Sequence, residues 1–213
     1  MRACRLLLTG LLTMKSKSNE TGWHVANCLW RTRERRGANH RDKQTESFDV
    51  QCLSVKLHHR PNLLPAALEA LLEKHHRYNK KYHVVYGDCG TAGGIDRVLQ
   101  KYQAERKSGP RCFSFFEGND NFANSEDNLT SFFFTDLFCR HFYKFIWQEF
   151  GIEREKSMVE LLFGNYKKVV YLAQTENAEL KSRARKISKK LELEFEYRYR
   201  GYRDLGIFIE NIQ

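Results

Sequence analysis

Beyond residue 47 the chain alternates between two hydrophobic patterns. Short apolar runs of strand length recur at 48–57, 82–86, 129–134, 166–174 and 192–200. Amphipathic stretches of helix length, with apolar residues three or four positions apart, lie between them at 61–78, 94–107, 135–152 and 176–191. This alternation of strand and helix predicts an α/β fold of three layers, in which helices cover both faces of a mostly parallel sheet.

The chain before residue 48 differs from the rest. Residues 1–47 show neither helical nor strand periodicity and are rich in charged and polar residues, so we expect a poorly ordered segment there. Residues 48–213 are numerous enough to bury one core, and we expect a single α/β domain. Within this domain, RCFSFF (111–116) predicts a short strand followed by a polar loop, with a brief helix as an alternative in this segment.

The net charge of +10 raises the question of nucleic-acid binding. Residues 1–47 carry ten Lys and Arg against four Asp and Glu, so +6 of the charge belongs to that segment and +4 to 48–213. The stretch KSRARKISKK (181–190) is basic, but it contains no aromatic residue, and charges on a helix usually form a solvated face. We therefore rank nucleic acid last among the partners.

The six cysteines are scattered, without CxxC spacing or the dense framework of a small disulfide-rich protein. No apolar run approaches the roughly 20 residues that span a membrane. The stretch LLLTGLLT (6–13) is not followed by the cleavage site of a signal peptide. We expect a cytoplasmic protein with reduced thiols and no membrane partner, in which Cys52 and Cys139 are core residues.

Polar residues follow several of the predicted strands. They are His58, His59 and Arg60 after the first strand, Thr135 and Asp136 after the third, and Gln174 and Thr175 after the fourth. The carboxyl ends of parallel strands meet at one edge of a sheet, where α/β proteins bind their ligands, so Arg60, Thr135, Asp136 and Gln174 are candidate ligand-binding residues. Helix capping alone would explain Thr135 and Asp136.

The loop after the second predicted strand is the most distinctive segment. Its four glycines allow a close approach of the backbone to a ligand: Gly87, Gly90, Gly93 and Gly94. Asp88, Cys89 and Thr91 stand among them. The loop is neither a Walker A sequence nor GxGxxG, and a tight turn without a ligand is an equal alternative. Cys89 lies near the start of the next helix, where the helix dipole favours the thiolate.

Five segments stand out in a fixed order: LHHRP (57–61), YGDCGTAGGIDRVL (86–99), GPRCFSFF (109–116), FFFTDLFCRHF (132–142) and FGNYKKVVYLAQT (163–175). Together they resemble the bacterial and archaeal family known as domain of unknown function 1638, over about residues 48–212. The resemblance implies a metal-binding motif. By association, it also implies corrinoid-dependent methyl-transfer systems as partners.

The resemblance also indicates which residues form that motif. The family's two cysteines fall on Cys89 and Cys112, and its His-Arg-Pro segment falls on His58, Arg60 and Pro61. Family members usually open with a strand that ends in Ala-Cys-Gly, whereas this chain has only ACR (3–5), about forty residues before the first predicted strand. One hypothesis is that residues 1–47 come from a shifted reading frame or a misassigned start. The altered N-terminus also leaves open whether this copy is active.

Thiolate and imidazole ligands suit zinc or iron. Cys89, Cys112 and His58 supply three ligands, with Cys4 or His141 as candidates for a fourth. Two placements weigh against this set. Cys112 precedes its expected strand, which puts it at the wrong edge of the sheet, and His141 lies on an aromatic helix face, as a core residue would. The remaining histidines in predicted elements are expected on the surface, at His75, His76 and His83.

Three functions fit these patterns. The first is a cytoplasmic metal-binding protein, either a catalyst or an accessory to methyl transfer, whose predicted ligands converge. The second is an enzyme or binding module for a small anionic ligand that the glycine-rich loop and Arg60 hold and that Gln174 or Asp136 selects; its thiols would not converge. The third is nucleic-acid binding. No reaction follows, because the sequence shows no HExxH motif and no catalytic triad that can be placed.

Overall fold

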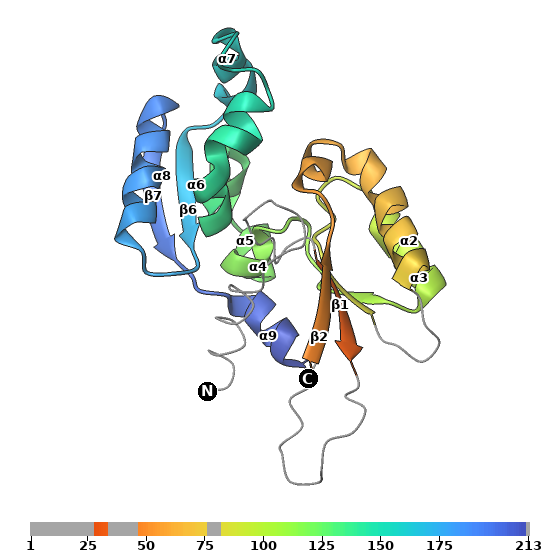
Figure 1. Ribbon diagram of the computed structural model, residues 1–213. Helices are drawn as coiled ribbons and strands as arrows, with labels where there is room; N and C mark the ends of the chain where they lie inside the picture. The colour runs from red at the N-terminus through yellow and green to blue at the C-terminus, as the bar shows by residue number, and fades with distance from the viewer. Residues whose placement is uncertain (1–27, 34–46, 76–81, 212–213) are drawn as a thin grey trace. The chain divides into compact units, whose positions relative to one another are not determined.

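A computed structural model describes residues 28–33, 47–75 and 82–211. The chain divides into two compact units: unit 1 comprises the residues up to Cys112 and those from Ile207 onward, and unit 2 runs from Phe113 to Gly206. Each unit contains a β-sheet with helices packed on it, which confirms the predicted α/β class (Figure 1). The single domain expected over 48–213 stays a prediction.

The sheet of unit 1 has the strand order β2–β1–β3–β4. Its strands are β1 (Cys28–Arg33), β2 (Ser47–Cys52), β3 (Tyr82–Val85) and β4 (Glu105–Arg106). β1 is antiparallel to both β2 and β3, whereas β3 and β4 are parallel. β1 lies within the segment 1–47, for which no strand was predicted. Because β2 and β3 are both antiparallel to β1, they point in the same direction.

Two helices cover one face of this sheet, α2 (Leu64–His75) and α3 (Gly94–Tyr102). They pack their apolar side chains against β3, in a cluster that includes Leu64, Leu68, Leu72, Tyr82, Val84, Ile95, Val98 and Leu99. α3 ends five residues earlier than the sequence predicts, since Gln103 adopts a left-handed conformation with φ of 49° and the chain turns into β4. The first predicted strand also ends early, at Cys52, before the short helices η2 (Val55–His59) and η3 (Pro61–Leu63).

The sheet of unit 2 is entirely parallel, with the order β5–β6–β7. Its strands are β5 (Ser131–Thr135), β6 (Lys168–Ala173) and β7 (Glu194–Tyr199). The central strand β6 is fully buried from Val169 to Ala173, as a parallel strand covered on both faces should be. β7 is an edge strand in this sheet, as its alternating charged residues predict.

Helices pack on both faces of this second sheet. On one face lie α6 (Asp136–Phe142), its π-helical continuation η5 (Tyr143–Gln148) and α8 (Ala178–Lys190); on the other lie α4 (Ser114–Glu117) and α5 (Asn119–Ala123). The short strand predicted at 111–116 is wrong, because residues 114–117 form α4; a short apolar run fits either element. The sequence did not predict α7 (Ser157–Phe163) or α9 (Arg203–Asn211). Over the ranges that the structure describes, no helix is long and apolar enough to cross a membrane.

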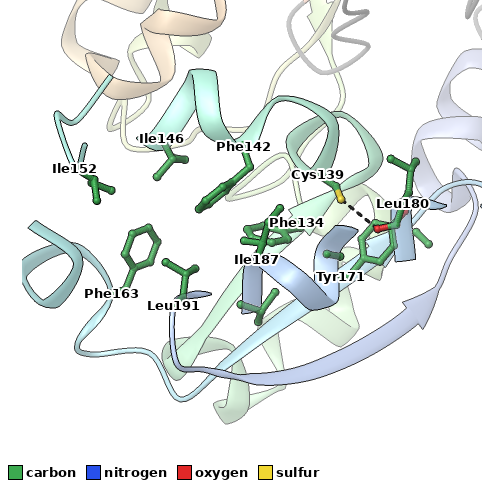
Figure 2. Close-up of a cluster of buried hydrophobic side chains, with 13 residues drawn as sticks. Phe134, Cys139, Phe142, Ile146, Ile152, Phe163, Tyr171, Leu180, Ile187 and Leu191 are labelled. Atoms are coloured by element: carbon green, nitrogen blue, oxygen red, sulfur yellow. Dashed lines mark hydrogen bonds between the residues drawn. The ribbon is translucent and has the colours of Figure 1, made fainter. Parts of the chain in front are cut away.

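Figure 2 shows the core of unit 2, between its sheet and the helices α6 and α8. Phe134, Phe142 and Tyr171 have no exposed surface. Cys139 is also fully buried, which confirms its prediction as a core residue, and its thiol donates a hydrogen bond to the carbonyl of Leu180 at 3.3 Å (Figure 2).

Candidate metal centre

Three segments of unit 1 leave the sheet at the same edge. η2 follows β2, the glycine-rich loop (86–93) follows β3, and residues 107–112 follow β4. Because β2, β3 and β4 all point in one direction, these segments begin at the carboxyl edge, where ligands of α/β proteins bind. Each segment brings one of the predicted metal ligands to this edge.

These ligands are His58, Cys89 and Cys112, and their side chains converge. The two Sγ atoms are 3.4 Å apart, and the imidazole and thiol ligand atoms of the three residues all lie within 4.8 Å of one another. The backbone amide of Cys112 also donates to Cys89 Sγ at 3.4 Å. The concern that Cys112 lies at the wrong edge is therefore unfounded: this residue follows β4 and precedes a helix.

Close backbone packing explains how Cys112 reaches the loop. The amides of Asp88 and Cys89 donate to the carbonyls of Gly109 and Pro110, both at 2.9 Å, so the backbone of the segment that leads to Cys112 lies against the loop after β3. Gly87 makes this approach feasible. A Cβ at this position would lie 2.6 Å from the carbonyl carbon of Arg111 and 2.8 Å from the amide nitrogen of Cys112.

The other side of the site is built by the start of α2. A Cβ on Gly94 would lie 2.6 Å from Pro65 Cγ, so only glycine lets the start of α3 pack this closely against α2. Pro61 and Pro65 cause no loss of hydrogen bonds, because they stand at the beginning of the helical stretch. His58 lies just before them in η2, with its ring centroid 5.2 Å from that of the buried Tyr86.

The electrostatics of the thiol pair are asymmetric. The hydrogen bond with Cys112 lowers the pKa of Cys89 to about 5, and the hydrogen bond and charge of His58 add to this effect against the opposing effect of burial. The pKa of Cys112 is raised instead, because its proton is held in the bond to Cys89 and because the side chain is buried. The pair therefore carries one thiolate and one thiol near neutral pH, and a bound metal would replace the remaining proton.

Tyr86 is a member of this site that the sequence did not identify. It is buried beside the two cysteines, and burial together with their negative charge raises its pKa. A tyrosine at the end of an apolar strand gives no sequence signal of such a position. The backbone conformation of Cys89 also had no sequence signal. Its φ of 47° is left-handed, which costs a non-glycine residue about 1–2 kcal/mol and is common at functional turns.

Several amides of the glycine-rich loop donate hydrogen bonds within the loop itself. The carboxylate of Asp88 accepts hydrogen bonds from the Gly93 amide at 2.9 Å and the Thr91 hydroxyl at 2.7 Å. Partial burial acts to raise the pKa of Asp88, but these bonds and one from the Ala92 amide together lower it. The amides of Thr91 and Gly94 donate to carbonyls of the same loop. Asp88 thus occupies the position that a bound anion would take, which weakens the anion interpretation of this loop.

The remaining predicted ligand-binding residues lie elsewhere. Arg60 is exposed and is not among the three converging residues. Thr135, Asp136 and Gln174 belong to unit 2, at the carboxyl ends of β5 and β6. Thr135 caps α6 by accepting from the amide of Phe138 at 3.5 Å, as the capping interpretation predicted.

Asp136 and Gln174 bond to each other and to their neighbours. The carboxylate of Asp136 accepts from the Tyr171 hydroxyl at 2.9 Å and from the amides of Gln174 at 3.0 Å and Thr175 at 3.1 Å. The side-chain oxygen of Gln174 accepts from the amide of Asp136 at 2.7 Å. These contacts join the ends of β5 and β6, which is a structural role.

Other cysteine and histidine predictions have mixed outcomes. Cys4, one candidate for a fourth ligand, and His76 lie outside the described residues. The other candidate, His141, belongs to unit 2. His83 is 6% exposed, so its prediction as a surface residue is wrong. Cys52 is exposed and disulfide-bonded, so the prediction of a reduced core cysteine is wrong at this position.

Comparison with known proteins gives one match. A family model with the description "Protein of unknown function (DUF1638)" matches residues 52–207. No curated protein and no solved structure matches the chain. The matched range includes His58, Cys89 and Cys112.

Proposed function

The chain belongs to the DUF1638 protein family, and we propose that it binds a metal ion, zinc or iron, through Cys89, Cys112 and His58. The convergence of these three ligand atoms within 4.8 Å carries the proposal. The three ligands follow three different strands, so their convergence is produced by the fold and not by closeness in the sequence. Two thiolates and an imidazole are a ligand set typical of zinc and iron sites.

The spacing of the thiols fits a tetrahedral metal. With metal–sulfur bonds of about 2.3 Å, two thiolates of a tetrahedral site lie about 3.8 Å apart. The observed separation of 3.4 Å would need to open only slightly. Metal binding would also displace the proton that the two sulfurs share, since both cysteines bind a metal as thiolates.

Three protein ligands meet among the described residues, which would leave one coordination position for water or a substrate, as in catalytic zinc sites. This arrangement supports a catalyst or a cofactor-handling protein over a purely structural site. The partner that we propose is a corrinoid-dependent methyl-transfer system. Sedimentation of the purified chain with a purified corrinoid protein of such a system would test this pairing, and sedimentation as two independent species would contradict it.

The first test of metal binding is elemental analysis of protein purified under anaerobic, reducing, metal-replete conditions. We expect close to one metal ion per chain in the wild type and a loss of that metal in Cys89→Ser and Cys112→Ser. The matched control is Cys139→Ser, which changes a buried cysteine of unit 2 whose hydrogen bond to Leu180 a serine hydroxyl can replace. A wild type without metal, or equal metal in all four proteins, would contradict the proposal.

A second measurement separates three protein ligands from four. Cobalt(II) substituted for the native metal should show sulfur-to-metal charge-transfer absorption, which His58→Gln should alter without abolishing. Its ligand-field bands should shift when a small thiol is added, because the thiol takes the open position. Ligand-field bands that do not shift when the thiol is added would indicate a site with four protein ligands, as in structural zinc sites.

A further inference from the structure

The solvent-facing side of α8 is predominantly basic. Six of its residues are basic and exposed: Lys181, Arg183, Arg185, Lys186, Lys189 and Lys190. Within the described ranges, none of the six forms an ion pair. The only acidic residue of the helix is Glu179, in its first turn. A solvated helix face usually mixes both signs in pairs three or four residues apart. On this face only Glu179 and Arg183 have that spacing, so its excess of cations departs from the usual pattern.

The six cations form two rows along the helix. At about 100° per residue, Lys181, Arg185 and Lys189 lie on one flank, and the other three lie on the opposite flank. Each row extends about 10–12 Å along the axis at 1.5 Å per residue. This length corresponds to about three or four phosphates of one DNA strand.

Aromatic rings from neighbouring elements hold three of these cations in place. The Lys181 ammonium lies 4.0 Å from the ring centroid of Tyr197 in β7, and the Lys190 ammonium lies 3.9 Å from that of Trp147 in η5. Arg185 lies over Phe195, at 5.0 Å. The sequence showed no aromatic residues within the helix, but the fold supplies them from both sides. These three charges are therefore held in place, and ordering them on an anion costs less side-chain entropy.

From this arrangement we propose that the exposed face of α8 binds the phosphate backbone of a nucleic acid. Backbone binding requires cations and little else, and its affinity comes from the release of counterions. The sequence ranked this partner last on the assumption of an ordinary solvated face. The predominantly basic face of α8, whose six cations form no ion pair with the described residues, removes that assumption. The proposal is independent of the metal site in unit 1.

Two other partners fit the face less well. Protein interfaces are depleted in lysine and need an apolar centre, whereas the exposed residues of α8 that are not basic are Ala178, Glu179 and Ser182. A membrane-bound helix inserts its apolar side into the lipid. The apolar side of α8, including Leu180 and Ile187, is buried in the core of unit 2 and is not available for insertion.

The test measures the binding of labelled oligonucleotides to the full chain by fluorescence anisotropy. The probes are a mixed-sequence 20-nucleotide single strand and the matching duplex. The test variant is Arg183→Gln/Lys186→Gln/Lys189→Gln, which removes three exposed cations without a ring contact. The control variant, Arg154→Gln/Lys156→Gln/Lys167→Gln, removes three exposed cations of unit 2 outside α8, so both variants have the same net charge.

We expect the test variant to bind at least about tenfold more weakly than the control at 0.1 M salt, with a slope of log K against log salt that is smaller by roughly 2–3. A wild type that binds neither probe would overturn the proposal. Equal binding by the two variants would also overturn it, because the affinity would then come from another part of the chain. Binding to phosphatidylserine vesicles or to an acidic protein without binding to either oligonucleotide would assign the face to that partner instead.

Discussion

Replacing Gly87 with alanine tests how the backbone builds the metal site. The new Cβ would lie 2.6 Å from the carbonyl carbon of Arg111, 2.9 Å from its Cα and 2.8 Å from the amide nitrogen of Cys112. All three atoms belong to the backbone, so no side chain can rotate away to relieve the overlap. The segment that carries Cys112 must move instead.

The size of this movement follows from ordinary contact distances. Non-bonded atoms rarely approach a Cβ closer than 3.4 Å, so the Arg111 carbonyl carbon must retreat by about 0.8 Å. Metal–ligand distances tolerate only about 0.2 Å. We therefore expect a metal affinity that is 10–100-fold weaker, equal to about 1.4–2.8 kcal/mol. The overlap should also lower the free energy of unfolding by about 1–3 kcal/mol.

Two assays separate these effects. Competition with a chromophoric chelator gives the metal affinity of the folded protein, and urea denaturation of the metal-free protein gives the stability. The matched control is Gly164→Ala at the end of α7, where a Cβ would lie 2.6 Å from the carbonyl oxygen of Glu160. This control should lose similar stability and keep its metal affinity, because the overlap lies in unit 2.

An unchanged metal affinity in Gly87→Ala, with the protein folded, would refute the reasoning. It would mean that the metal is bound elsewhere or that Cys112 is not a ligand. A loss of affinity in both variants would instead show that general destabilisation, and not the placement of Cys112, controls binding.

Three further predictions concern the thiol pair and the second unit. In metal-free protein, iodoacetamide should alkylate Cys89 at a nearly constant rate from pH 8 to pH 6 and at half that rate near pH 5, because the lowered pKa keeps this thiol ionised as the pH falls. Mass spectrometry should find Cys112 unmodified. A rate that falls tenfold for each pH unit below pH 8 would contradict the lowered pKa of about 5. Diamide should oxidise the two thiols of metal-free protein to a Cys89–Cys112 disulfide, since their sulfurs need to close only from 3.4 Å to about 2.0 Å; peptide mapping should find no such bond in metal-loaded protein. Asp136→Asn should lower the free energy of unfolding by about 2–3 kcal/mol, because an amide cannot accept all the hydrogen bonds of the carboxylate. The metal content should not change. A denaturation midpoint equal to that of the wild type would contradict the structural role of Asp136.

Hydrophobic periodicity predicts most of the fold because long runs leave few alternatives. The apolar run within 166–174 is rich in β-branched residues and predicts a buried strand, and the structure places β6 there. Short segments were predicted less well. RCFSFF contains too few residues to separate a strand from a helix, and β1 owes its conformation to pairing with β2 and β3 and not to its own pattern.

The candidate site, like the fold, could be predicted from the sequence only in part. Residue chemistry and the family resemblance identified Cys89, Cys112 and His58, and the rule that ligands bind at carboxyl edges identified the edge. The contribution of Cys112 could not be derived from its place in the sequence, because it depends on the pairing of residues 109–112 with the loop after β3. That pairing depends on Gly87, whose role as a close-contact position is visible only once the two segments are seen together.

A comparison of the two sheets explains why only one edge is a candidate metal centre. In unit 2 the carboxyl ends of β5 and β6 also present polar residues, but Asp136 and Gln174 satisfy each other and the adjacent amides. In unit 1 the residues that meet at the edge are soft ligands, two of which share one proton between their sulfurs. The carboxylate of Asp88 already accepts hydrogen bonds from amides of the loop. A metal ion is the ligand that satisfies two close thiolates and an imidazole at once, whereas an anion would repel the thiolates and find the loop amides occupied. The carboxyl edge of the sheet therefore serves structure in unit 2 and is the candidate metal centre in unit 1, and the difference lies in which side chains leave electron pairs available.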